Sequence, residues 1–247
     1  MGILYNRFTP GFTLLPYSDQ SKIITYATYD NFNANSSTWG TGSAPIVRES
    51  GNWSKDSDAQ GFISFGASFT EIQNIAALGN KFTIYEVLKH VNFPQMYTSF
   101  DYNLVISRGS QSTSEYLFSP TLGTGYGHYD YDCHTTGGVV GVPCNLPTLD
   151  QMHITAAAYQ YTPDNRQSRI AAFCNYNSGR AGPTTITSSS LYGVRIAGTT
   201  SLSTRCYKFI AVVADDESVI YTDNRSIVEW NMAVLKHYFG VEYDSPI

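Results

Sequence analysis

The sequence predicts an all-β fold: a two-sheet antiparallel jelly-roll sandwich with one short amphipathic helix near its C-terminus. Aromatic residues make up 14% of the chain, and with β-branched residues they suit the half-buried, pleated surface of a sheet. Runs of alternating polar and apolar residues recur, and 20 glycines and 10 prolines supply turns between them. The length of 247 residues fits one sandwich domain.

Residues 81–91 are the clearest strand, because Ile84 and Leu88 fall on one side of the alternation and Tyr85 and Val87 on the other. Further strands are expected at 22–29, 61–69, 101–108, 114–118, 152–161, 168–176, 191–197 and 205–214. Among these, 152–161 and 168–176 form a predicted hairpin.

Other stretches are expected to lie between the strands. Residues 30–45 and 119–150 are rich in turn-forming residues, and both are expected to be loops. Residues 70–78 are expected to form a short helical turn closed by Gly79. No repeat, linker or shift in composition divides the chain. We therefore expect an irregular N-terminal arm at residues 1–20 and one jelly-roll domain at 21–247.

One helix is expected close to the C-terminus. Ser226, followed three residues later by Glu229, forms a capping box, which is the signature of a helix start. Gly240 is the expected stop. Apolar residues recur at helical spacing at Ile227, Trp230, Val234, Leu235 and Tyr238. The helix is therefore predicted to be amphipathic, with these residues on its apolar face.

The charge pattern excludes two classes of partner. The net charge is −5, and the basic residues form no block or stripe. Nucleic-acid binding draws its affinity from phosphates that lysine and arginine neutralise, so nucleic acid is not an expected partner. The same deficit argues against an anionic membrane surface, and no apolar run approaches the roughly 18 residues that span a bilayer. The first residues lack the pattern of a signal peptide.

The four cysteines, Cys133, Cys144, Cys174 and Cys206, form no C-x-x-C pair, which argues against a zinc or redox site. Because no export signal is evident, we expect four buried, reduced thiols. The alternative is a bridge between Cys133 and Cys144, which flank a glycine-rich stretch.

Four segments resemble, in order, the central strands of a known family. Residues 82–89 are similar to its FTI-x-x-W/V-x-K strand, and residues 105–109 to its I-L/F-S-K-G strand. Residues 152–159 resemble its W-H-H-V-A-V-T-Y strand, with Met152 where the family prefers tryptophan. Residues 170–177 match its L-Y-V-N-G strand.

The C-terminal part continues the resemblance. Residues 209–213, 220–226 and 237–240 are similar to the family's closing strand, its turn and the end of its helix, with an extra segment at 215–219. The family is the concanavalin A-like lectin and glucanase superfamily, in its laminin-G-like branch. The resemblance implies a jelly roll and a choice among lectins, glucanases, adhesion modules and phage or viral surface proteins.

The catalytic pattern of the superfamily is missing. Its retaining glucanases carry an E-x-D-x-x-E strand, and such enzymes hold their two carboxyl groups about 5 Å apart. Here the only acidic cluster is Asp215–Glu217, at a strand end, where a solvated turn is the favoured interpretation. No hydrolase, zinc-protease or nucleotide-binding motif occurs. We therefore expect a non-enzymatic protein, with no catalytic residues, metal ligands or cofactors.

The segment 125–134 is the strongest candidate for a binding surface. Aromatic rings stack on sugars or on partner side chains, and carboxylates accept hydrogen bonds from hydroxyl groups. The candidate ligand-binding residues are Tyr126, Tyr129, Asp130, Tyr131, Asp132 and His134. One alternative is a loop whose tyrosines cover the sandwich or meet a neighbouring subunit. The least favoured alternative is a divalent-ion site on the alternating acidic and histidine residues.

Trp39 and Trp53 are further candidates, because both lie in stretches rich in glycine, serine and asparagine. Exposed, they would anchor a glycan or a protein partner. Buried, they would only pack against other residues. The sequence leaves both alternatives open.

The first functional hypothesis is a virion surface or structural protein, such as a capsid decoration or a component of a head or tail fibre. Its expected location is the virion, and its partners are other virion proteins or further copies of itself, with a host surface glycan in addition. The alternative is a free-standing carbohydrate-binding lectin, extracellular or at a cell surface. A polysaccharide hydrolase is the least favoured hypothesis.

Overall fold

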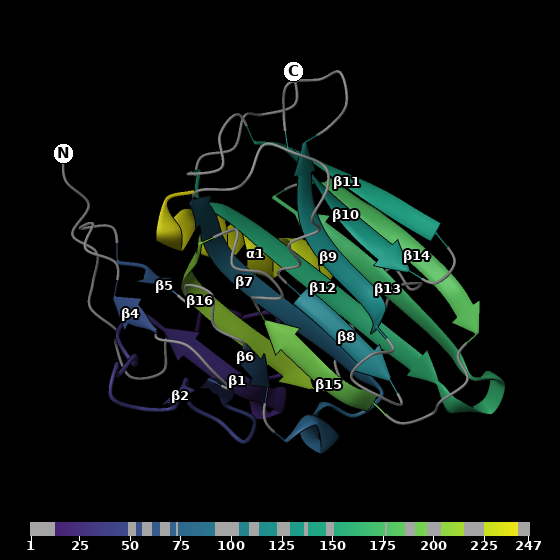
Figure 1. Ribbon diagram of the computed structural model, residues 1–247, viewed down its shortest axis with the longest axis horizontal. Coiled ribbons are helices and arrows are strands. Elements are labelled where there is room, and N and C mark those ends of the chain that lie inside the picture. Colours follow the sequence, from purple (N-terminus) through teal and green to yellow (C-terminus); the bar gives the residue numbers. More distant parts are fainter. Residues whose placement is uncertain are drawn as a thin grey trace.

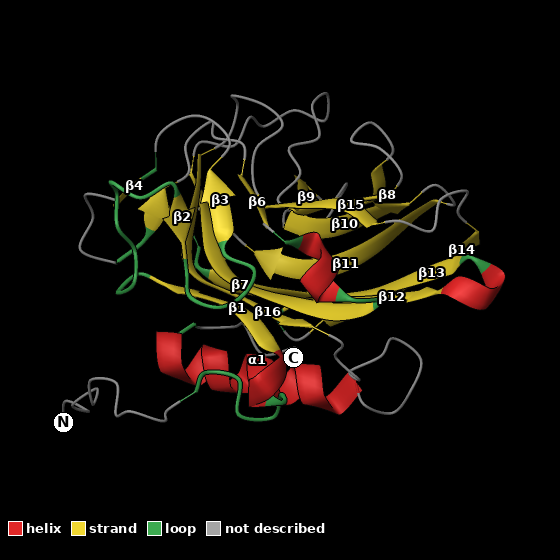
Figure 2. Ribbon diagram, turned by 90° about the horizontal axis from the view of Figure 1, so that it is seen from below, coloured by secondary structure: helices red, strands yellow, loops and turns green. Residues whose placement is uncertain are grey.

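Two antiparallel sheets face each other in the computed structural model, as Figures 1 and 2 show. The structure describes residues 13–48, 53–55, 61–64, 70–72, 74–91, 104–108, 114–122, 129–135, 138–146, 151–175, 177–185, 191–196, 204–214 and 225–241. The predicted two-sheet sandwich with a C-terminal helix is confirmed.

The central sheet lies between the outer sheet and the helix. Its strands, in spatial order, are β14 (Asn177–Thr185), β13 (Gln167–Cys174), β12 (His153–Thr162), β7 (Lys81–Val91), β16 (Thr204–Ala214), β5 (Ile63–Ser64) and β4 (Ser54–Lys55). Strand β1 (Ile23–Thr28) also pairs with β16. The expected hairpin is confirmed as β12 and β13, joined by the 3₁₀ turn η3 (Pro163–Asn165).

The outer sheet covers one face of the central sheet. Its order is β11 (Gly138–Leu146), β10 (Tyr129–Thr135), β9 (Ser114–Leu122), β8 (Leu104–Arg108), β15 (Leu191–Ile196), β6 (Thr70–Ile72), β3 (Ile46–Arg48) and β2 (Thr38–Trp39). Two further 3₁₀ turns are η1 (Gln20–Lys22) and η2 (Ile75–Leu78). The helix α1 (Arg225–Phe239) lies across the other face of the central sheet, below β7, β12 and β16 in Figure 2.

Burial on both faces explains why the central strands carry apolar residues on both of their faces. Tyr85 points to α1, because its hydroxyl accepts a hydrogen bond from Asn231 Nδ2 at 3.2 Å. Phe209 lies on the same face, with its ring 5.8 Å from that of Phe239. On the opposite face the rings of Phe82 and Tyr159 are 4.9 Å apart. The strands therefore bury apolar side chains at both odd and even positions, as strands covered on both faces do.

The structure corrects the expected face of the helix. The buried residues of α1 are Val228, Asn231, Met232 and Leu235, while Trp230 is 52% exposed. The sequence pattern pointed to Trp230 because it is apolar and passed over Asn231 because it is polar. Hydrogen bonds satisfy Asn231 and so allow its burial.

The two helix ends differ in how well the sequence predicted them. The helix begins at Arg225, so Ser226 lies inside its first turn and not at the cap. The predicted stop is confirmed: Gly240 has a φ of +66°, and Val241 N–H donates to the Lys236 carbonyl at 3.1 Å. This 6→1 bond is a Schellman motif, which uses glycine because of its positive φ.

Part of the expected N-terminal arm belongs to the domain. Leu14 and Leu15 are completely buried in the hydrophobic core. Tyr17 N–H donates to Asn231 Oδ1 at 3.1 Å. Residues 13–20 therefore pack on the helix because they bury apolar side chains there, whereas residues 1–12 lie outside the described residues.

The expected loop at 119–150 is wrong. Strand β9 continues to Leu122, and β10 and β11 form a hairpin beyond it, with Cys133 paired with Phe118 on one side and Val140 on the other. Glycines and prolines such as Pro143 suggested a loop, but pairing with neighbouring strands overrides local preference. Strand β14 was missed for the same reason. Residues 70–72 are a strand, so the helical turn is confined to η2.

The cysteines differ from the expectation of four reduced thiols. Cys174 is disulfide-bonded, whereas Cys206 is buried and not part of a disulfide. The side chains of Cys133 and Cys144 lie outside the described part of the structure. The expectation rested on the missing export signal, which says nothing about how close two thiols come in the fold.

No helix among the described residues combines the length and the apolar character that crossing a membrane requires.

We expect Asn231→Leu to lower the free energy of unfolding by about 2–3 kcal/mol, because it removes the part-buried acceptor of Tyr17 N–H and the buried hydrogen bonds to Ser18 and Tyr85. Urea unfolding monitored by tryptophan fluorescence measures this. His237→Ala, at an exposed position of the same helix, is the control and changes stability by no more than about 0.5 kcal/mol. Equal losses in both variants would contradict the role of Asn231.

Stability is expected to fall in acid because of His153. Burial lowers the pKa of His153 to about 4 from its ordinary 6.5, and Nδ1 donates to the Gln151 carbonyl at 2.9 Å. The unfolded chain therefore takes up a proton at a higher pH than the folded chain does. Stability is fully present above pH 6.5 and is lost as the pH falls to about 4, by about 3 kcal/mol.

The check is a comparison of His153→Leu with the natural protein by urea unfolding across this range. The natural protein should lose about 3 kcal/mol more stability than the variant does between neutral pH and about pH 4. A difference that is constant with pH would show that His153 does not carry the acid sensitivity.

Candidate binding pocket

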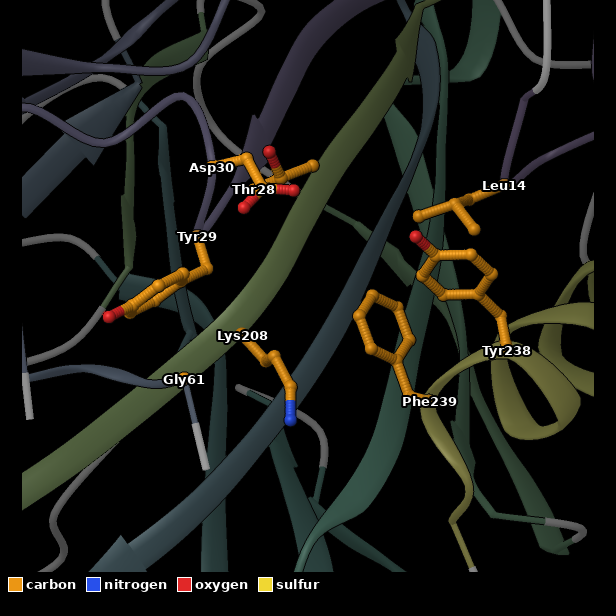
Figure 3. Close-up of a pocket in the computed structure, with 8 residues that line it drawn as sticks. All are labelled: Leu14, Thr28, Tyr29, Asp30, Gly61, Lys208, Tyr238 and Phe239. Carbon is orange, nitrogen blue, oxygen red and sulfur yellow. The ribbon is translucent and has the colours of Figure 1, made fainter. Parts of the chain in front are cut away.

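A pocket of about 390 Å³ opens where the N-terminal segment, the end of β1, β16 and the end of α1 meet (Figure 3). Its lining residues are Leu14, Thr28, Tyr29, Asp30, Gly61, Lys208, Tyr238 and Phe239. The volume lies within the range of small-molecule sites. Five separate parts of the chain build this pocket, so its shape depends on tertiary packing.

The end of α1 supplies one wall. The edge of the Tyr238 ring meets the Phe239 ring, with the centroids 4.9 Å apart and the planes at 84°. The Phe239 ring packs in turn on Phe209 of β16, which fixes it to the central sheet. The helix stops at Gly240 and no longer covers the central sheet beyond that residue. The rings of Tyr238 and Phe239 therefore border the pocket.

The end of β1 and the turn after it supply Thr28, Tyr29 and Asp30. The side chain of Asn31 holds this turn: Oδ1 accepts from Thr28 N–H, and Nδ2 donates to the Tyr26 carbonyl, both at 2.9 Å. Trp39 Nε1–H donates to the Thr28 carbonyl at 2.8 Å. The backbone of this wall is therefore fixed by side chains that lie outside the pocket.

Lys208 and Gly61 form the third side. Lys208 lies at a bulge in β16, because Tyr207 pairs with Leu88 while Phe209 pairs with the adjacent Val87. Gly61 has a φ of +74°, a backbone conformation that residues with a side chain rarely adopt. A β-carbon there would lie 3.7 Å from Tyr29 Cγ and 3.9 Å from Lys208 Cε, so the backbone of Gly61 lies close to both side chains.

Tyr238 at the pocket stays protonated at neutral pH. Burial raises the pKa of Tyr238, and the negative charge of Asp30 raises it further. Burial also raises the pKa of the neighbouring Tyr26 to about 12. A neutral phenol can donate a hydrogen bond to a ligand oxygen, while the carboxylate oxygens of Asp30 can accept hydrogen bonds. The pocket thus combines apolar ring surface with hydrogen-bonding groups of both kinds.

The candidate residues of the segment 125–134 are only partly within the described structure. Tyr126 lies outside it. Tyr129, Asp130, Tyr131, Asp132 and His134 lie in β10, and the structure describes their backbone but not their side chains. From Tyr129 on, the segment is a strand and not a loop. Within the described residues, no group of three histidine, cysteine or acidic side chains has the arrangement to hold a metal ion.

Trp39 and Trp53 are buried, with exposed fractions of 1% and 4%. The ring of Phe32 lies between them, 6.0 Å from Trp39 and 6.3 Å from Trp53. Of the two alternatives left open by the sequence, burial supports packing. A buried indole cannot stack on a ligand unless the surrounding residues move.

Sequence reasoning missed the residues that line the pocket. The signal for Lys208 was a single charge in the apolar run from Tyr207 to Val213. Tyr238 was assigned to the apolar face of the helix, and Tyr29 to the end of a strand. No signal in the sequence shows that the helix end reaches β1, because they are about 200 residues apart.

One exposed aromatic pair lies away from the pocket. The rings of Tyr17 and Trp230 are 5.2 Å apart, and the two residues are 51% and 52% exposed. They lie between the N-terminal segment and the first half of α1. Neither residue lines the pocket.

No protein-family model and no curated protein matches the chain. Among solved structures, the binding domain of botulinum neurotoxin DC in complex with SialylT matches 87% of the chain, with 8% identity and a TM-score of 0.54. A mutant Trypanosoma rangeli sialidase with trans-sialidase activity matches 91%, with 10% identity and a TM-score of 0.58. The chain spans 51% of the first of these proteins and 34% of the second.

A third structure is matched along nearly its whole length. Domain 4 of AbnA, an extracellular arabinanase of Geobacillus stearothermophilus, in complex with arabinotriose, matches 84% of the chain. The chain covers 97% of that domain, with 11% identity and a TM-score of 0.51. At these identities the likeness concerns the fold. The chain therefore shares a β-sandwich fold with the neurotoxin binding domain and the arabinanase domain.

Proposed function

We propose that this protein is a non-catalytic carbohydrate-binding module and that the pocket beside α1 holds a sugar unit. The pocket itself carries the proposal, because its lining combines the aromatic residues Tyr29, Tyr238 and Phe239 with the acidic residue Asp30 (Figure 3). Rings pack against the apolar faces of sugars, and a carboxylate accepts hydrogen bonds from hydroxyl groups.

The structural neighbours support the same class of function. The neurotoxin binding domain and the arabinanase domain are each described in complex with a ligand, SialylT and arabinotriose. One fold serves many functions, so this likeness raises the expectation of binding and does not identify residues. The residues come from the pocket.

The absence of a carboxylate pair supports binding over hydrolysis. Asp30 is the one carboxylate among the described lining residues. Glycosidases of the common types need two carboxyl groups on either side of the glycosidic bond. Glu86, a buried acid of the central sheet, accepts a hydrogen bond from Thr155 Oγ1 at 2.8 Å and does not line the pocket.

The disulfide of Cys174 supports a place outside the reducing cytosol. An extracellular position and the surface of a particle both meet this condition. The virion surface expected from the sequence is one such place, with other virion proteins or further copies of the chain as neighbours. Electron micrographs of the full-length protein on symmetric particles would establish it.

We expect the protein to give saturable binding on a glycan array and Tyr29→Ala to lower the affinity for the bound glycans about tenfold. The reason is the loss of one ring of the pocket, since an aromatic contact contributes about 1 kcal/mol beyond its buried area. Tyr17→Ala removes an exposed tyrosine elsewhere and should leave binding unchanged. Thermal unfolding of both variants checks that they are folded.

Two results would contradict this proposal. The first is an array without saturable binding to any glycan. The second is a folded Tyr29→Ala protein that binds as the natural one does. If Tyr129→Ala abolishes binding while Tyr29→Ala does not, the glycan site belongs to β10 and not to the pocket.

A further inference from the structure

Three of the six lysines of the chain gather beside the pocket, although the protein as a whole has a net charge of −5. They are Lys55, Lys89 and Lys208, and we call this group the lysine cluster. They come from β4, β7 and β16, so the fold brings them together from distant parts of the sequence. Lys208 lines the pocket directly.

Two aromatic rings hold the lysine cluster in place. Lys55 Nζ lies 4.1 Å from the centre of the Tyr29 ring. Lys89 Nζ and Lys208 Nζ lie 4.6 and 4.9 Å from the centre of the Phe62 ring. Such cation–π contacts attract an ammonium group to a ring face. Lys89 and Lys208 therefore share the Phe62 ring, and Lys55 lies on Tyr29, which lines the pocket.

Gly61 connects the two rings to the pocket. It precedes Phe62 in the chain, and its backbone lies against the side chains of Tyr29 and Lys208. The cluster is thus continuous with the wall that Tyr29 and Lys208 form. Lys89 is only 6% exposed, so its charge acts through protein more than through water, where screening is weaker.

The charges on the pocket lining are arranged at opposite sides. Asp30 and Thr28 lie together at one side, and Lys208 extends away from them with its ammonium group on the far side (Figure 3). Asp30 accepts hydrogen bonds from neutral hydroxyl groups and repels an anion. The lysine side attracts an anion, because clustered like charges raise the local potential.

We propose that the pocket selects acidic sugars, with the hydroxyl groups of the sugar at Asp30 and its carboxylate or sulfate group at the lysine cluster. This inference rests on the proposed carbohydrate-binding function and names its ligand class. Carboxylate and sulfate share the chemistry that the cluster recognises, namely a compact anion with several acceptor oxygens.

Matched pairs of probes test the selectivity. They are 3′-sialyllactose with lactose, trigalacturonate with its methyl ester, and a chondroitin sulfate oligosaccharide with its desulfated form, which retains a carboxylate. In at least one pair, the member with the additional anionic group should bind at least tenfold tighter by calorimetry. About 0.5 M salt should reduce this difference, because screening weakens attraction between partly exposed charges.

Variants of Lys208 test whether this residue is the source of the preference for the more anionic probe. Lys208→Gln should reduce the preference for the more anionic probe about tenfold, and Lys208→Arg should retain most of it, because the charge is kept. Lys81→Gln, at the opposite end of β7, makes the same change in net charge and should leave the preference intact. Thermal unfolding confirms that each variant is folded.

The outcomes separate the two proposals. If no probe binds and the glycan array is blank, the proposed function itself fails. If both members of every pair bind equally at low salt, the carbohydrate site stands and acid selectivity is overturned. It is also overturned if folded Lys208→Gln retains the full preference, or if Lys81→Gln loses as much as Lys208→Gln does. A preference confined to the sulfate pair or to the carboxylate pairs supports the proposal and identifies the anion.

Discussion

The side-chain amide of Asn231 fixes the arrangement on which the rest of the molecule depends. It accepts from Tyr17 N–H, and its Nδ2 lies within hydrogen-bond distance of Ser18 Oγ at 2.8 Å and Tyr85 Oη at 3.2 Å. One residue therefore connects α1, the N-terminal segment and the central sheet. A polar residue at this place requires these partners, because a buried amide without them is costly. The requirement sets the rotation of α1 about its axis.

That rotation decides which helix residues meet the pocket. With Asn231 against the sheet, Trp230 faces outward, while Tyr238 and Phe239 reach the space beside β16. The helix covers the part of the central sheet formed by β7, β12 and β16 (Figure 2). The packing of α1 on the sheet ends near two features, the helix stop at Gly240 and the bulge at Lys208. The position of the pocket thus follows from the length of the helix.

The sequence predicted those features of the fold that local pattern controls. Strand β7 has the bounds that its alternation indicated, and Gly240 ends the helix as expected. Strands β10, β11 and β14 were missed, because their glycines and prolines resemble loop sequence and only pairing across the sheet makes them strands. The buried face of the helix was predicted wrongly at Asn231, because hydrogen bonds offset the free-energy cost of burying its polar side chain. The pocket joins residues that no spacing rule connects, so it was not predictable.

The surroundings of Tyr29 show how the fold prepares the pocket before any ligand arrives. Lys55 lies over the Tyr29 ring at 4.1 Å, and the backbone of Gly61 lies beside the same ring. Asn31 and Trp39 fix the N–H and the carbonyl of Thr28, the residue before Tyr29. A side chain held in this way loses little freedom when a ligand binds, and ordering flexible side chains is one of the main costs of association. Because Lys55 occupies one face of the ring, a sugar has to approach Tyr29 from the other face or from its edge. The same contact that fixes the ring therefore also limits the orientations that a bound sugar can adopt.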